Sequence, residues 1–309
     1  MPADSRPDLA SALAVVIVHY RCPTLLRQCL ASLPACRVIV VDNSGDAGIP
    51  DAIVNETNRG FAAACNQGIR ATTEPFVLLL NPDTVVSRAA LERLLATMTG
   101  GDARRWAERP REAGQDTRLA GTPAPPPAGG SHECPPMTKG IGACGPLVRN
   151  DDGSVQTSAR RFPTLWRMAL AEFGLRRWYY VSQPGQDAEQ LMGSCLLLRR
   201  EALEQVGLLD ERFFVYFEEV DLCLRLKQAG WRVVFVPDAE ITHIGGQSSQ
   251  TDRTASLRYR YRSLFEFYRK HYPRWHLPVL KLEVQLAATL RVLTGQRAYR
   301  AIATEVWSL

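Results

Sequence analysis

No run of apolar residues in this 309-residue sequence approaches the ~18 to 20 positions that a membrane-spanning helix needs. The first residues also lack the basic segment of a secretory signal, because Asp4 and Asp8 lie where such a signal is positive. We therefore expect a cytoplasmic protein. The composition, 46% hydrophobic and 22% charged residues, is typical of a folded globular chain and excludes a disordered or collagen-like one.

Several nucleotide-binding and redox signatures are also absent. No Gly-x-Gly-x-x-Gly follows the first apolar run, and no Gly-x-x-x-x-Gly-Lys-Ser/Thr is present. These absences disfavour an oxidoreductase of the dinucleotide-binding type and a P-loop kinase or NTPase. The Gly-rich signature of a sugar-phosphate nucleotidylyltransferase is missing as well. None of the eight cysteines forms a Cys-x-x-Cys pair, so we expect reduced, mostly buried thiols.

The net charge of +5 is unevenly distributed along the chain. Residues 253–309 contain 11 basic and 3 acidic residues, whereas residues 1–252 are close to neutral. This distribution argues against a nucleic-acid footprint over the whole protein. It favours one basic element that faces an anionic partner or surface.

Apolar runs alternate with helical patterns along most of the chain. Strands are expected at 14–18, 38–41, 52–54, 76–80, 141–148, 195–198 and 232–237, and helices at 24–33, 60–71, 87–98 and 220–229. This alternation predicts an α/β fold with a mostly parallel, Rossmann-like sheet flanked by helices.

Two segments depart from the alternation. Residues 100–139 are rich in proline and glycine, which predicts a mobile insertion without chemistry of its own. From residue 253 the pattern is helical, with one helix ended by Pro273 and another over 279–293 whose wide apolar face must pack against something. We therefore expect a catalytic domain over 1–252 and a basic helical extension over 253–309.

Polar residues that could carry chemistry follow the predicted strands. Asp42 and Asp83 lie at strand ends, where open parallel sheets bind ligands. An acidic group, Glu218-Glu219-x-Asp221, opens a predicted helix, and His243 follows the last strand. Taken singly, each has a simpler explanation, because such residues also serve in turns, helix caps and favourable helix termini.

The order and spacing of these residues point further. The set resembles the family 2 inverting glycosyltransferases, and most closely their rhamnosyltransferase-like branch, over about residues 14–250 apart from 100–139. The motifs that carry the resemblance are Val-Val-Ile-Val-His-Tyr (15–20), Val-Asp-Asn-Ser (41–44), Asn-Arg-Gly-Phe-Ala-Ala-Ala-Cys-Asn (58–66), Leu-Asn-Pro-Asp-Thr (80–84), Met-Gly-Ser-Cys (192–195), Gly-Leu-Leu-Asp-Glu-Arg-Phe-Phe (207–214), Tyr-Phe-Glu-Glu-Val-Asp-Leu-Cys-Leu-Arg (216–225) and His-Ile-Gly-Gly-Gln-Ser (243–248).

The resemblance implies a GT-A fold that binds a nucleotide-diphosphate sugar. Asp42 would hydrogen-bond the base, and other residues would line the same pocket. These are His19, Tyr20, Asn58, Arg59, Gly60 and Asn81.

The resemblance also implies a divalent cation, Mg²⁺ or Mn²⁺. Asn81-Pro82-Asp83 stands where the family has its Asp-x-Asp metal motif, so that Asp83 is the remaining acid and His243 would complete the shell. A cation there would offset the charge that the leaving diphosphate gains.

Glu219 aligns with the family's catalytic acid and would be the base that deprotonates the acceptor hydroxyl. Glu218 and Asp221 compete for this role, and like charges so close could raise the pKa of one carboxyl group.

The expected reaction is transfer of L-rhamnose from dTDP-rhamnose to a hydroxyl of a glycan or lipid-linked acceptor in cell-envelope polysaccharide synthesis. Two alternatives stay open: another donor, such as UDP-galactofuranose or a UDP-hexose, or a non-catalytic nucleotide-sugar-binding protein. The C-terminal helices either pack internally or at a dimer contact, or attach the enzyme peripherally to the cytoplasmic face of the plasma membrane.

Overall fold

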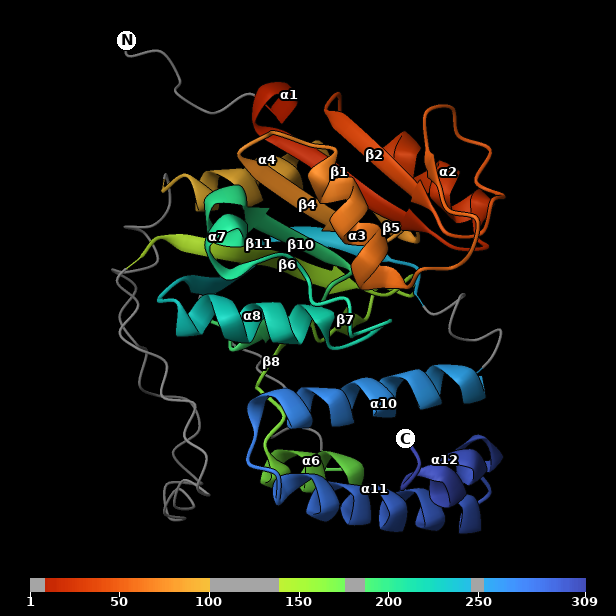
Figure 1. Ribbon diagram of the computed structural model, residues 1–309. Helices are drawn as coiled ribbons and strands as arrows, with labels where there is room; N and C mark the ends of the chain where they lie inside the picture. Colours follow the sequence, from red (N-terminus) through yellow and green to blue (C-terminus); the bar gives the residue numbers. More distant parts are fainter. Residues whose placement is uncertain (1–8, 101–138, 176–186, 246–252) are drawn as a thin grey trace.

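The computed structural model describes residues 9–100, 139–175, 187–245 and 253–309. Its centre is a nine-stranded sheet in the order β3-β2-β1-β4-β10-β6-β11-β5, with β7 paired to β6 (Figure 1). These strands are β1 (Leu13–His19), β2 (Arg37–Asp42), β3 (Ile53–Val54), β4 (Phe76–Leu80), β5 (Thr84–Val85), β6 (Ile141–Arg149), β7 (Val155–Gln156), β10 (Cys195–Arg199) and β11 (Arg232–His243). A separate two-stranded sheet pairs β8 (Ala159–Arg160) with β9 (Gln190–Leu191).

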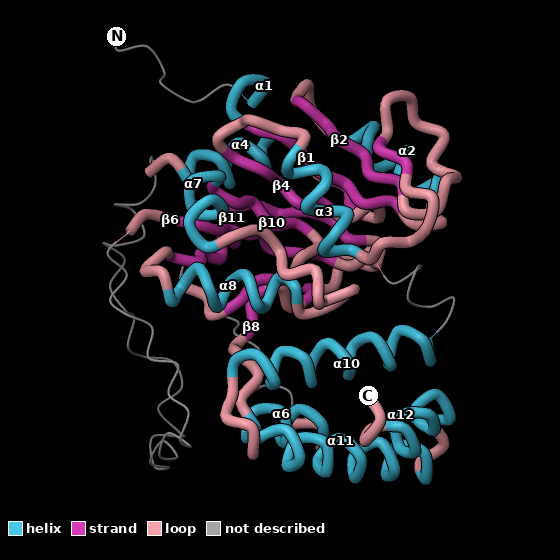
Figure 2. Tube along the Cα trace, in the orientation of Figure 1, coloured by secondary structure: helices cyan, strands magenta, loops and turns pink. Residues whose placement is uncertain are grey.

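Helices flank the sheet and also form a second layer beyond it (Figures 1 and 2). They are α1 (Leu9–Ala12), α2 (Pro23–Ser32), α3 (Phe61–Arg70), α4 (Arg88–Met98), α6 (Leu165–Glu172), α7 (Arg200–Val206), α8 (Glu218–Gln228), α10 (Arg253–His271), α11 (His276–Leu293), the 3-10 helix η2 (Arg297–Tyr299) and α12 (Arg300–Glu305). The expected α/β fold with a helical C-terminal region is therefore confirmed.

The sheet is parallel in its N-terminal half and mixed elsewhere. Strand β1 pairs in parallel with β2 and β4, and all residues of β1 and β4 are buried, as their unbroken apolar runs predict. Strand β10 runs antiparallel to both β4 and β6. An apolar run does not encode strand direction, so the sequence did not predict this reversal.

Pairing between strands brings distant polar residues together. The register of β1 on β2 places His19 opposite Asp42, and the register of β11 on β5 places His243 opposite Thr84, next to Asp83. Strand β11 is longer than predicted, because the ladder with β6 resumes after a register shift between Val236 and Glu240. This continuation carries His243 to the point where β5 begins.

The C-terminal helices share a buried core with the sheet domain. One cluster of buried residues runs from Phe213 and Leu222 to Tyr261, Phe265 and Leu280. Helix α10 ends at His271, before Pro273, as predicted. Helix α11 begins at His276, before the predicted start, because Pro278 fits within the first turn, where an N–H has no intrahelical partner.

Some features were not predicted from the sequence, and others cannot be compared. Helices α1, α6, α7 and α12 and the short strands β7, β8 and β9 were not expected, and α1 lies where the apolar stretch from Leu9 to Val18 was expected to be strand. The expected mobile insertion over 100–139, apart from its end residues Gly100 and Lys139, lies outside the described residues, as does the end of the motif that starts at His243. Within the part of the chain that the structure describes, no helix combines the length and apolar character needed to cross a membrane.

Candidate active site

Asp83 and His243, the predicted metal ligands, lie side by side where β5 meets the end of β11. His243 Nε2 is 3.1 Å from Asp83 Oδ1, and both side chains are largely buried. The backbone N–H of Ile244 also donates to the carbonyl of Asp83 over 2.9 Å. The structure therefore brings together two residues that are 160 positions apart in the sequence.

The hydrogen bonds around His243 determine which ring nitrogen carries a proton. Gln156 donates its side-chain N–H to Asn150 Oδ1 over 3.0 Å, so its Oε1 faces His243 Nδ1 at 2.8 Å. Because Oε1 can only accept, Nδ1 carries a proton and donates it. Nε2 is then the ring nitrogen that faces Asp83 Oδ1, so a cation held here would bind this nitrogen and the Asp83 carboxylate.

This donor set fits a divalent cation. It combines a carboxylate oxygen with an imidazole nitrogen whose other nitrogen is held by a second residue, an arrangement typical of metal sites. The Asn81 side-chain nitrogen lies 3.5 Å from His243 Nε2, so the residue that replaces the first acid of the motif is adjacent. Sequence reasoning missed Gln156, because nothing in the short segment around β7 marks it as a partner of His243.

A second group with distances compatible with a metal lies at the ends of β1 and β2. One ligand atom from each of His19, Asp42 and Asp46 falls within 4.8 Å of the others. Hydrogen bonds already explain this group, because His19 Nε2 lies 2.9 Å from Asp46 Oδ1. Asp46 was not expected at this position from the sequence.

Asp42 organises the loop that follows β2. Its Oδ1 accepts from the backbone N–H groups of Ser44 and Gly45, and its Oδ2 accepts from Ala47, each over 2.9 Å. Burial alone would raise the pKa of Asp42, but these bonds lower it below its usual value. Asp42 is therefore an ionised, buried carboxylate, much of whose accepting capacity is used by its own loop.

The other predicted nucleotide-binding residues lie around the same strand ends. The Arg21 guanidinium lies over the Tyr20 ring at 5.1 Å. Asn58 Oδ1 accepts from the backbone N–H of Gly60 over 2.9 Å, whereas Arg59 is exposed.

Gly60 is required by its surroundings. It has a φ of +86°, and a Cβ placed there would lie 2.5 Å from the carbonyl oxygen of Phe214. The start of α3 therefore packs directly on the segment that leads into α8.

The candidate base Glu219 lies in the first turn of α8. The two residues before this helix, Tyr216 and Phe217, have φ values of +67° and +70°, an uncommon conformation for large side chains. Such local strain occurs at functional sites, where the surrounding structure holds it in place. Here it directs Glu219 into a cavity of about 810 Å³ between α8 and the C-terminal helices.

Glu218 and Glu219 form a buried carboxyl pair. Oε2 of each side chain is buried and has no hydrogen-bond partner. Burial, together with the charge of Glu219, raises the pKa of Glu218 well above its usual value. Burial also raises the pKa of Glu219, although backbone N–H groups at the helix start, the charge of Arg160 and the Glu218 carboxyl group oppose this rise. A protonated Glu218 beside an ionisable Glu219 suits general-base chemistry at neutral pH.

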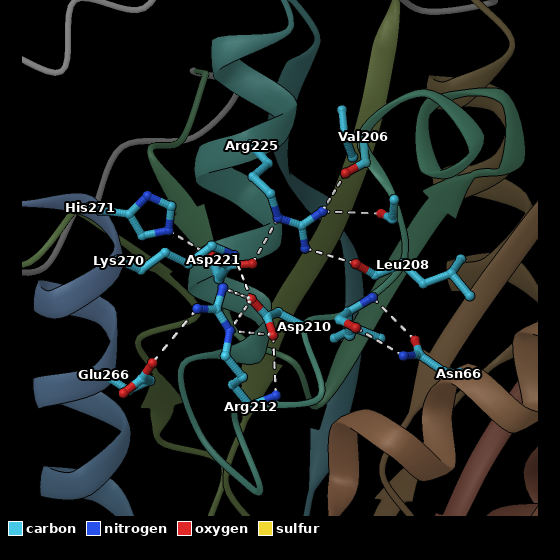
Figure 3. A network of polar contacts seen from close by, with 12 residues as sticks. Asn66, Val206, Leu208, Asp210, Arg212, Asp221, Arg225, Glu266, Lys270 and His271 are labelled. Atoms are coloured by element: carbon cyan, nitrogen blue, oxygen red, sulfur yellow. Dashed lines mark hydrogen bonds and ion pairs between the residues drawn. The ribbon is translucent and has the colours of Figure 1, made fainter.

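Asp221, the third candidate base, has a different environment (Figure 3). It is fully buried, and cationic or hydrogen-bonding groups of Arg225, Lys270 and His271 surround its carboxylate. Burial alone would raise the pKa of Asp221, but these three partners lower it. Such a carboxylate is a weak base, and its position indicates a role in joining α8 to α10.

The fold and this site define a class of protein: an α/β enzyme with an aspartate–histidine pair at one sheet edge and a glutamate that faces a cavity. Residues 10–276 match the sequence model of the family described as "Glycosyltransferase like family 2". The match spans most of the chain, which therefore belongs to this family and is a glycosyltransferase.

Curated relatives include proteins from bacteria and an archaeon. The chain is 30% identical, over 92% of its length and 92% of the relative's, to the N-acetylglucosaminyl-diphospho-decaprenol L-rhamnosyltransferase of Mycobacterium tuberculosis. It is 22% identical, over 70% of its length and 62% of the relative's, to the low-salt glycan biosynthesis hexosyltransferase Agl10 of Haloferax volcanii. Among solved structures, the mannosyltransferase PcManGT from Pyrobaculum calidifontis, in complex with GDP-Man and Mn²⁺, aligns with 99% of this chain and 88% of its own. The alignment has 15% identity and a TM-score of 0.47.

Proposed function

We propose that this enzyme is an inverting transferase that moves L-rhamnose from dTDP-rhamnose to a sugar hydroxyl on a lipid-linked acceptor, in cell-envelope polysaccharide synthesis. The observation that supports this most strongly is the similarity to the mycobacterial rhamnosyltransferase, which extends over 92% of both chains. That relative's name specifies a sugar joined through a diphosphate to a prenyl lipid. We assign the same class of acceptor to this chain.

In the proposed reaction, Glu219 takes the proton of the acceptor hydroxyl as that oxygen attacks the anomeric carbon. Glu218 stays protonated beside it and keeps a second negative charge out of the buried pair. Asp83 and His243 would hold the Mg²⁺ or Mn²⁺ ion, with Asn81 adjacent. When bound, the ion offsets the negative charge that develops on the leaving nucleoside diphosphate.

The nucleotide would lie over the carboxyl ends of β1 and β2. Tyr20, already paired with the Arg21 guanidinium, offers a face on which a base can stack. Asp42 holds the loop at 43–47 and, with His19, would form the floor of the nucleotide site. Asn58, Arg59 and Gly60 would border this site at the start of α3.

Residues 253–309 would form an extension that attaches the enzyme to the cytoplasmic face of the plasma membrane. One face of α11 is buried, but a stripe at three- and four-residue spacing is exposed. We call this the α11 stripe: Val279, Leu282, Leu286, Leu290 and Leu293, whose side chains are 39% to 79% exposed. Trp166 and Phe173, at α6 and its C-terminal end, and Trp275 and Trp307, flanking α11 and α12, are also more than half exposed.

A membrane surface is the occupant that fits these helices. Helices α6 and α12 pack against α11, and the three lie together on the side of the molecule away from β2 (Figure 1). The segment that contains the stripe carries 11 basic and 3 acidic residues, and each basic residue near an anionic surface contributes about 1 kcal/mol. A lipid-linked acceptor lies in such a surface.

The donor assignment is tested by measuring thermal shift and donor hydrolysis with dTDP-rhamnose, UDP-galactofuranose, UDP-glucose, UDP-N-acetylglucosamine and GDP-mannose, each with Mn²⁺ or Mg²⁺. We expect dTDP-rhamnose to give the largest shift and the fastest release of nucleotide. A clear preference for UDP-galactofuranose or a UDP-hexose would replace the donor assignment. No binding of any nucleotide sugar by the folded protein would reject the proposed function.

A further inference from the structure

The cavity that contains Glu219 is lined by described residues from three separate parts of the chain, within 160–190, 216–220 and 253–299. Arg160 of β8 and Gln190 of β9 lie on one wall, and residues of α10, α11 and η2 form much of the rest. Its volume of about 810 Å³ is in the range of small-molecule sites. The cavity is therefore large enough for more than the single hydroxyl that the base would deprotonate.

The charged side chains of this cavity are mostly cationic. Arg291 is matched by Glu172, with which it forms an ion pair. Among the described residues that line the cavity, the other charged side chains are those of Arg160, Arg253, Arg260 and Glu219. With four arginines and two glutamates, this described lining favours an anionic ligand.

Two of these arginines come from one face of α10. Arg253 and Arg260 are seven positions apart, which is close to two helical turns, and Ser256 and Leu257 lie between them on the same face. Arg160 approaches from β8, and its charge is close enough to act on Glu219. Guanidinium groups from separate elements can bind the oxygens of two linked phosphates, each with a pair of donors.

We propose that this arginine-lined cavity binds the diphosphate of the lipid-linked acceptor, with Arg160, Arg253 and Arg260 as its ligands. The inference rests on the proposed function, since it assumes that the acceptor sugar is joined to its lipid through a diphosphate. It places the acceptor hydroxyl at Glu219 and the diphosphate at the arginines. The prenyl chain then runs toward α6 and α11, where the exposed apolar residues lie.

The diphosphate of the donor is the other candidate ligand for these arginines, and the geometry disfavours it. In an inverting displacement, the base and the leaving diphosphate lie on opposite sides of the anomeric carbon. The predicted cation pair, Asp83 and His243, lies at the β5–β11 edge, while the cavity is built from α6, β8, β9, α8 and α10 to η2. The arginines thus lie on the base side of the reaction.

Binding can be measured without catalysis by using farnesyl diphosphate, farnesyl monophosphate and farnesol as probes below their micellar concentrations. The test variants are the double substitution Arg253→Ala/Arg260→Ala and, from the other wall, Arg160→Ala. The matched control is Arg262→Ala, which removes an exposed arginine two positions from Arg260, outside the cavity face of α10. A donor arm measures binding of dTDP with Mn²⁺ to each protein.

We expect the wild type to bind farnesyl diphosphate at least tenfold more tightly than the monophosphate. The double variant should lose at least tenfold in affinity for farnesyl diphosphate, Arg160→Ala should lose several-fold, and all proteins should bind dTDP equally. If the double variant is poorly folded, the single variant Arg260→Gln should still lose several-fold in affinity for farnesyl diphosphate.

Unchanged binding of farnesyl diphosphate, or an equal loss in Arg262→Ala, would overturn the inference. So would a loss confined to dTDP, which would assign the cavity to the donor. Donor hydrolysis by the wild type distinguishes this result from a failure of the proposed function. If only the inference is wrong, the wild type still hydrolyses the donor; if the proposed function is wrong, it does not.

Discussion

His271 Nε2 lies 2.6 Å from Asp221 Oδ1 and so joins the end of α10 to the first turn of α8. Arg225 binds the other oxygen of Asp221 over 2.7 Å and also donates to backbone carbonyls of the loop before α8 (Figure 3). The C-terminal segment is therefore connected by buried charges to the helix that begins with Glu219. Substitutions that break these contacts are therefore expected to shift the position of the candidate base Glu219.

Asp221→Ala should destabilise the protein by about 3–5 kcal/mol, because it leaves the cations of Arg225 and Lys270 without their buried partner. Denaturant unfolding of the variant and of Asp238→Ala, which removes an exposed carboxylate, measures the difference. The lowered pKa of Asp221 means that its stabilisation is present above about pH 4 and is lost in more acidic solution. The gap between wild type and variant should thus narrow below pH 4, and a pH-independent gap would contradict this account.

Glu219→Gln should lower kcat by about 10²- to 10⁴-fold while leaving donor affinity nearly unchanged. The substitution removes the proton acceptor but keeps the size of the side chain and most of its hydrogen bonding. Single-turnover transfer and nucleotide binding, measured on the same preparation, separate the two effects. Near wild-type turnover would exclude Glu219 as the base, and Glu218→Gln would then be the variant to measure.

The cation is expected to bind at Asp83 and His243 rather than at His19, Asp42 and Asp46. Asp83→Ala should therefore abolish Mn²⁺-dependent donor binding, and excess EDTA should do the same to the wild type. Asp46→Ala is the matched control, since it removes an acid from the second group. If Asp46→Ala lost Mn²⁺-dependent donor binding and Asp83→Ala did not, the metal site would be assigned to the ends of β1 and β2. Full activity of the wild type in excess EDTA would reject a metal requirement.

The sequence predicts the parallel half of the fold well, because buried strands such as β1 and β4 are continuous apolar runs with clear ends. The helix expected over 87–98 is also present, and the Ser87 hydroxyl caps it by accepting from the backbone N–H of Ala90. The sequence does not predict β10 as antiparallel, because the same apolar run suits either direction. Nor does it predict α6. The buried face of this helix, which includes Met168, is small, and it packs against α11, a contact that the local sequence does not reveal.

The same limit applies to the site. Asp83, Glu219 and His243 could be selected because they occur in local motifs with a recognisable order. Gln156 and the cavity arginines could not, because their role depends on which elements meet in space. The family motif favours Glu219 over its competitors Glu218 and Asp221, and the burial and partners of each carboxylate add a physical distinction that the sequence does not contain.

Glu283 of α11 gives a pH-dependent test of how the C-terminal helices pack. Burial, together with the charge of Glu172, raises the pKa of Glu283 to about 7, and its Oε2 has no hydrogen-bond partner. The folded state then holds this proton more tightly than the unfolded state, so stability falls as pH rises from about 4.5 to about 7. Glu283→Gln should therefore raise the melting temperature by about 2 °C at pH 8 and by less at pH 5. If wild type and Glu283→Gln had equal melting temperatures at pH 5 and at pH 8, the charged Glu283 carboxylate would not destabilise the folded protein.

The α11 stripe is expected to bind anionic membranes. Leu286→Glu/Leu290→Glu places two charges in the exposed face and leaves the buried face of α11 intact, so folding should persist while binding is lost. Flotation with vesicles of anionic or neutral lipid, at low and high salt, measures this. Val54→Glu is the control, because Val54 is equally exposed but lies on the edge strand β3. We expect wild type and Val54→Glu to float with anionic vesicles in a salt-sensitive manner, and the double variant to stay in solution. If the wild type does not float, and is instead a dimer that the double variant dissociates, the stripe is a contact between two copies of the chain and the membrane proposal is rejected.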